Sequence, residues 1–141
     1  MRLRETFEQA GLAYNPPPAV VPNTMRALRV TELARDRGLH EQVHDRLMEA
    51  YWEEARDIGD PAALRELAVE AGLDGTGVDE VLAGDAYRDR VLSSTQQAHS
   101  IGINGIPAFL LDRRLLVLGA QPRDVFEQAF AQLPGIPPPP N

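Results

Sequence analysis

Residues 104–118, NGIPAFLLDRRLLVL, decide the fold predicted for this chain, because here the sequence pattern changes from helical to extended. Two short apolar runs, 108–111 and 115–118, are separated by Asp112-Arg113-Arg114. Runs of this length around a polar turn predict two antiparallel strands joined as a hairpin. Both runs are apolar at every position, which is typical of strands inside a covered sheet.

Amphipathic segments predict helices on both sides of this hairpin. Asn23 is the expected N-cap of one of them, Asp60-Pro61 is a strong helix start, and Gly38 and Gly72 are stops. In the helix after Asn23, the expected buried residues are Ala27, Leu28, Val30, Thr31, Leu33 and Ala34. The predicted helices cover residues 2–12, 24–37, 41–56, 61–71, 78–83, 85–101 and 123–132. The expected fold class is therefore α+β and mostly α.

Composition indicates one globular domain, with 43% hydrophobic and 25% charged residues in a chain of 141. The domain is expected over 1–133, with a helical part over about 1–102, the hairpin and last helix over about 103–133, and a proline-rich tail at 134–141. No apolar run reaches the roughly 18 residues needed to cross a bilayer. The first residues lack the apolar core of a signal peptide, so we expect no membrane association and a cytoplasmic location.

Charge and cysteine content restrict the chemistry further. The net charge is −7 and the positive residues form no cluster, so nucleic acid is not an expected partner. All fourteen positive residues are arginine, which leaves no lysine for Schiff-base chemistry. The chain has no cysteine, so it supplies neither a disulfide nor a thiolate nucleophile or ligand.

Three groups of segments together resemble the DsbA-like thioredoxin-fold family. Residues 104–111 resemble the cis-proline loop and the strand that follows it, and 118–122 resemble the end of the hairpin. Residues 22–28 and 56–61 are similar to the helical insertion of the branch that contains FrnE-type proteins and 2-hydroxychromene-2-carboxylate isomerases. The resemblance covers about residues 2–133 and implies a partial thioredoxin-like fold.

The resemblance also marks a departure. Family members begin with a strand, a Cys-x-x-Cys or single-nucleophile motif at a helix start, and a second strand. No segment of this chain corresponds to that unit, which needs at least about 30 residues. We therefore expect a family member that is catalytically incomplete as this chain, without catalytic residues of its own and without a cofactor.

The expected substrate-binding residues are Gly105, Ile106 and Pro107. The resemblance implies that Pro107 follows a cis peptide bond and that the backbone before it binds an extended peptide or a small ligand. An ordinary trans proline at a strand start is the alternative, since only about 5–6% of such bonds are cis. Two further functions stay open: a glutathione-dependent isomerase or transferase, and a non-enzymatic module that binds a partner.

Without the opening unit of the family, one edge of the sheet would be unpaired. The candidates for exposure are Phe109, Leu110, Leu111, Leu116 and Val117. Loss of burial for about three of them would cost on the order of 5–9 kcal/mol, against the ~5–15 kcal/mol that stabilises a domain. We therefore expect a homodimer, or another polypeptide, to cover the hairpin.

Other polar groups favour structural roles. His40 and His44 are four residues apart, but they lack the glutamate of a His-Glu-x-x-His motif, and nothing in the sequence supports His99 as a third ligand. No metal site is expected. Glu49, Glu53 and Glu54 are typical of a charged helix surface, and Tyr51 and Trp52 of helix packing.

Overall fold

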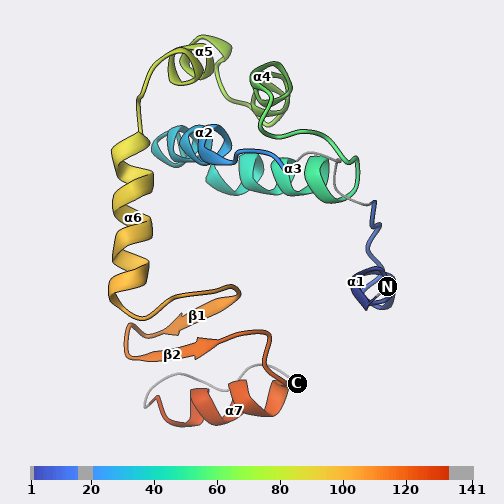
Figure 1. Ribbon diagram of the computed structural model, residues 1–141, viewed down its shortest axis with the longest axis vertical. Helices are drawn as coiled ribbons and strands as arrows, with labels where there is room; N and C mark the ends of the chain where they lie inside the picture. Colours follow the sequence, from blue (N-terminus) through green and yellow to red (C-terminus); the bar gives the residue numbers. More distant parts are fainter. Residues whose placement is uncertain (1, 16–20, 134–141) are drawn as a thin grey trace. The chain divides into compact units, whose positions relative to one another are not determined.

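The computed structural model describes residues 2–15 and 21–133, and within them it contains seven helices and a two-stranded sheet (Figure 1). The predicted tail at 134–141 lies outside the described residues. The chain forms two compact units, Met1–Ser93 and Ser94–Asn141, and their boundary falls within α6. The elements are α1 (Arg2–Gln9), α2 (Met25–Asp36), α3 (His40–Trp52), α4 (Pro61–Glu70), α5 (Gly75–Ala83), α6 (Arg88–Ser100), β1 (Ala108–Leu111), β2 (Leu115–Leu118) and α7 (Arg123–Ala131).

The first unit has its hydrophobic core between α2, α3, α4 and α5, which pack against one another (Figure 1). Its largest fully buried side chains come one or two from each helix: Val30, Val43, Leu64, Leu67 and Val78. Because each helix buries one apolar stripe against its neighbours, this bundle accounts for most of the apolar burial among the described residues.

Two aspartates determine where helices of this bundle begin. The Asp60 carboxylate accepts a hydrogen bond of 2.8 Å from the Ala63 amide, and Pro61 occupies the first helical position. Asp74 accepts one of 2.9 Å from the Gly77 amide, so α5 begins at Gly75 and not at residue 78 as the sequence pattern predicts. Each carboxylate satisfies an amide that has no partner within its helix.

Other helix limits also differ from the predictions. Thr24, and not Asn23, is the N-cap of α2, although Asn23 Oδ1 accepts a hydrogen bond from the Met25 amide. The third helix ends at Trp52, and at Ala55 the backbone is left-handed, with φ 54°. A second left-handed residue, Tyr87, precedes Arg88, so α6 begins three residues after Asp85.

The N-terminal helix is joined to the end of α3 by an aromatic cluster. The Phe7 ring lies 5.1 Å from Tyr14 and 5.7 Å from Trp52, measured between ring centroids. The Asn15 amide donates a 3.0 Å hydrogen bond to the Trp52 carbonyl oxygen. Trp52 therefore packs within the helical part of the chain, as predicted.

The second unit contains the hairpin and α7, which packs on β2 (Figure 1). The strands are antiparallel and pair Ala108 with Leu118 through to Leu111 with Leu115, which confirms both predicted strands. Phe109 packs edge-on against Phe126 of α7, with centroids 5.0 Å apart. Of the five candidates for exposure, Phe109 is 39% exposed, whereas Val117, opposite it in the ladder, is only 7% exposed and is therefore buried.

The other face of the hairpin is more open. Side chains alternate along a strand, so Ala108, Leu110, Leu116 and Leu118 share the face opposite Phe109 and Val117. Leu110 is 44% exposed and Leu118 46%. The expectation of a sheet covered on both sides therefore fails on this face within the described residues.

None of the helices that the structure describes has the length and apolar character needed to span a bilayer.

Candidate functional site

The loop between α6 and β1 is the candidate site. The chain leaves α6 at Gly102, whose left-handed φ of 91° suits glycine, and the Gly102 and Ile103 amides donate to the His99 and Ala98 carbonyl oxygens. At the other end of the loop, the Gly119 amide donates a 2.8 Å hydrogen bond to the Pro107 carbonyl oxygen. The loop is therefore anchored both to the helix before it and to the end of β2.

The three expected binding residues lie together at the surface of this loop. The peptide bond between Ile106 and Pro107 is cis. The Ile106 side chain is 94% exposed, and Pro107 is also exposed. No atom lies within 4 Å of where a Cβ of Gly105 would stand, so a ligand can approach the backbone closely here.

A pocket of about 380 Å³ adjoins the loop. Gly105 and Ile106 form one part of its wall, together with Ile103 and Asn104, and α6 forms the other part with Ser94, Thr95, Ala98 and His99. The sequence pattern does not support His99 as a metal ligand, and it does not indicate that His99 or Ser94 lies beside the loop. The signal was present, because residues four apart on a helix share a face and both Ser94–Ala98 and Thr95–His99 have that spacing.

The free edge of β1 extends the site. Within the described residues β1 pairs with β2 alone, so half of its backbone N–H and C=O groups face away from the ladder. The exposed Leu110 follows the loop by three residues. A segment in extended conformation can form backbone hydrogen bonds to such an edge and place an apolar side chain beside Leu110.

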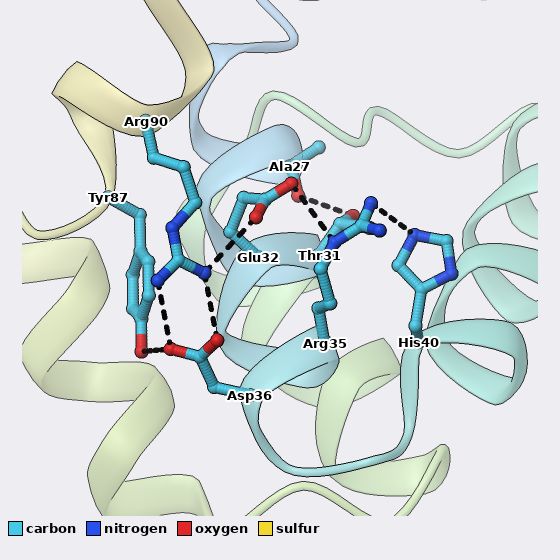
Figure 2. Close-up of polar contacts among 8 residues, drawn as sticks. All are labelled: Ala27, Thr31, Glu32, Arg35, Asp36, His40, Tyr87 and Arg90. Atoms are coloured by element: carbon cyan, nitrogen blue, oxygen red, sulfur yellow. Dashed lines mark hydrogen bonds and ion pairs between the residues drawn. The ribbon is translucent and has the colours of Figure 1, made fainter. Parts of the chain in front are cut away.

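A network of charged and polar side chains in the first unit includes Glu32, Asp36, Tyr87 and Arg90 (Figure 2). Arg90 Nη1 donates to Asp36 at 2.8 Å and to Glu32 at 3.3 Å, and the Tyr87 hydroxyl donates to Asp36 at 3.1 Å. The hydrogen bond from Arg90 lowers the pKa of Asp36, while burial and the Asp36 carboxylate raise the pKa of Tyr87. Asp36 and Glu32 both pair with Arg90, so the network joins residues 87–90 to α2 and leaves neither carboxylate unpaired.

The other polar groups considered in the sequence are distributed as charged helix surfaces. His40 Nε2 lies 3.1 Å from an Arg35 nitrogen, and His44 Nδ1 lies 3.3 Å from the Asp45 carboxylate. Glu49 and Glu54 both form ion pairs with Arg46. Among the residues that the structure describes, no group of three histidines and carboxylates could hold a metal ion.

Comparison with known proteins gives matches over nearly the whole chain. The family model described as "DSBA-like thioredoxin domain" matches residues 1–131. The crystal structure of a probable DsbA oxidoreductase from Streptomyces coelicolor superposes with a TM-score of 0.86 and 37% identity, over 99% of this chain and 61% of that chain. The uncharacterised protein YwbO of Bacillus subtilis is 29% identical over 126 residues, which are 88% of this chain and 62% of that protein. The chain thus spans about three fifths of the length of these two relatives.

Proposed function

The chain belongs to the DSBA-like thioredoxin domain family, and on this premise we propose that loop 105–107 and strand β1 bind an extended peptide segment. The occupant would pair with the free edge of β1 and contact Ile106 and Leu110. This surface would serve thiol–disulfide exchange in which the reacting thiol comes from outside these 141 residues. Within the family, we assign the chain to the FrnE-like branch on the resemblance of residues 22–28 and 56–61.

The observation that carries the proposal is the exposure of Ile106. The Ile106 side chain is 94% exposed, so it does not gain the free energy that burial of an isoleucine in a core provides. It lies at the start of a strand whose outer edge is unpaired among the described residues and whose open face carries Leu110. An extended segment docked here would cover the side chain and complete the backbone hydrogen bonds at the same time.

The chemistry that this surface would assist needs a sulfur nucleophile. In thiol–disulfide exchange a thiolate attacks one sulfur of a disulfide, a mixed disulfide forms, and the second sulfur leaves as a thiolate. This chain has no cysteine, so its own contribution is to hold the segment that carries the disulfide. We therefore expect the purified 141-residue chain to leave the rate of insulin reduction by dithiothreitol unchanged, and a rate increase would contradict this assignment.

Binding is tested by titrating the ¹⁵N-labelled protein with a blocked six-residue peptide of alternating valine and threonine. We expect the largest amide shifts within 105–111. Leu110→Lys should weaken binding about tenfold or more, because the charge would lie against the apolar side chains of the peptide. The matched control is Leu92→Lys, since Leu92 is 41% exposed and Leu110 44%.

Shifts spread evenly over the chain, or equal weakening by both substitutions, would contradict the proposal. Light scattering at each protein concentration identifies a competing occupant. A dimer that Leu110→Lys dissociates, and Leu92→Lys does not, would mean that a second copy of the chain covers this edge.

A further inference from the structure

A second pocket lies wholly within the first unit and is unrelated to the loop at 105–107. Its volume is about 340 Å³, and its walls come from the start of α2, the end of α5 and the turn before α6. The charged residues that line it are Arg26, Arg29, Arg88 and Asp85. Three positive side chains against one carboxylate make this pocket cationic in a chain whose net charge is −7.

Arg29 forms the floor of the pocket and is only 5% exposed. Its Nε donates a 2.7 Å hydrogen bond to the Ala86 carbonyl oxygen, and Nη2 donates to the carbonyl oxygens of Val81 and Gly84. These contacts position the guanidinium at the end of α5 but supply only partial negative charge. A buried charge without an opposite full charge is costly, and a bound anion would relieve that cost.

Arg26 and Arg88 lie at the exposed rim of the same pocket. Among the described residues, neither they nor Arg29 has a carboxylate within ion-pair distance, although most other arginines of this unit form such pairs. Guanidinium groups bind phosphate and carboxylate oxygens through paired hydrogen bonds. Three such groups around one pocket favour the binding of an oxyanion.

The start of α2 adds to the positive potential. Asn23, Met25 and Arg26 line the pocket; the Met25 amide donates to Asn23 Oδ1, while the Thr24 side chain makes no capping hydrogen bond. The positive end of the dipole of this twelve-residue helix therefore lies at the wall of the pocket that the three arginines also line.

We propose that the pocket formed by Arg26, Arg29 and Arg88 binds a small ligand through a phosphate or carboxylate group. The group would lie between the two rim arginines, above Arg29. Asp85 would oppose the ligand, so it limits affinity and selects against ligands with excess negative charge at that side.

The experiment is a calorimetric titration of the full chain with inorganic phosphate and, separately, with succinate, at pH 7.5 and low ionic strength. Amide shifts measured in parallel should map to residues 23–29 and 84–88. Binding of phosphate alone, succinate alone or both supports the site and identifies the oxyanion that it prefers. If neither anion binds, or if the shifts map elsewhere, the proposal is overturned.

Two variants with opposite expectations separate the site from a general charge effect. Arg26→Gln combined with Arg88→Gln should weaken binding about tenfold or more, because each removes a charge-assisted hydrogen bond from the anion. Asp85→Asn should tighten it about two- to fivefold, a gain that partial unfolding cannot produce. The matched control, Arg113→Gln with Arg114→Gln, removes the same charge from the hairpin turn. An equal loss in that control would overturn the proposal.

Discussion

At Arg29 a guanidinium lies among the carbonyl oxygens of Val81, Gly84 and Ala86, at the end of α5. The last carbonyl groups of a helix have no partner within it, and here a side chain from another helix supplies the donors. One residue thus joins α2 to α5 and to the turn that leads into α6.

We predict that Arg29→Met lowers the free energy of unfolding by about 3 kcal/mol, because the buried carbonyl of Val81 loses its donor at a cost of ~1–3 kcal/mol and the partly buried carbonyls of Gly84 and Ala86 lose theirs at a smaller cost. Urea denaturation in phosphate-free buffer measures the effect. Arg26→Met is the matched control, three residues away and exposed, and it should change stability by less than about 0.5 kcal/mol. Similar losses in both variants would contradict a special role for Arg29.

The sequence pattern does not predict this arrangement. It places Leu28 on the buried stripe of α2, but Leu28 is 46% exposed, while Arg29 beside it is buried. Hydropathy assigns an arginine to the surface, and only the three-dimensional position of the α5 terminus provides the carbonyl oxygens that permit its burial. By contrast, Ala27, Val30, Leu33 and Ala34 are buried as predicted, because their positions follow the helical period.

At the scale of the element, the hairpin turn is strained. Asp112 and Arg113 both have positive φ, 47° and 55°, and the Arg114 amide donates to the Leu111 carbonyl oxygen. Two successive residues with positive φ are typical of the tight turns that match the twist of a hairpin, where glycine is preferred at the second position. The sequence predicted the turn from its polar residues but contained no glycine to indicate this conformation.

Arg113→Gly should therefore stabilise the hairpin by about 0.5–1 kcal/mol, because glycine adopts positive φ without the steric cost of a Cβ. Arg114→Gly is the contrasting variant, since Arg114 has no positive φ, and it should destabilise by a similar amount. Amide hydrogen exchange at residues 109–117 measures the change in hairpin stability in each of the two variants. The prediction is contradicted if the two changes shift protection in the same direction.

Helix limits show what sequence reasoning can and cannot reach at this scale. Asp60-Pro61 begins α4 as predicted, because the cap and the proline are local signals. The start of α5 is missed by three residues, since its cap, Asp74, precedes Gly75-Thr76-Gly77, and glycines are poor helix formers. The capping hydrogen bond outweighs that propensity here.

At the scale of the whole molecule, burial is distributed unequally between the two units. The core cluster lies entirely between Ala27 and Val81, whereas the described part of the second unit buries only Val117, Ala129 and Leu133. A short segment with so little burial cannot offset the conformational entropy lost on folding.

We expect the fragment 1–93 to retain its helical circular dichroism and a cooperative urea transition when produced alone. The fragment 94–141 is the counterpart, and it should show no cooperative transition. The reverse result, or loss of helicity in both fragments, would show that the core of α2 to α5 does not fold independently.

The candidate site was predictable in part at this scale. Residues 105–107 were identified because their local sequence resembles a family motif. The residues of α6 that line the pocket were not identified from the sequence. The direction in which α6 presents His99 and Ser94 depends on where the helix begins and on the turn at Gly102. The cationic pocket at Arg26, Arg29 and Arg88 was also missed, because its three arginines are separated by up to 62 positions in the sequence and only folding brings them together.

The packing of Phe7 and Tyr14 around Trp52 gives the molecule an intrinsic optical reporter. Trp52 is the only tryptophan of the chain. Fluorescence that is excited at wavelengths too long for tyrosine therefore comes from this one residue, at its contact with α1. Release of that helix would expose the indole to water and shift its emission to the red. Attachment of the N-terminal helix can thus be followed in real time on the unlabelled protein.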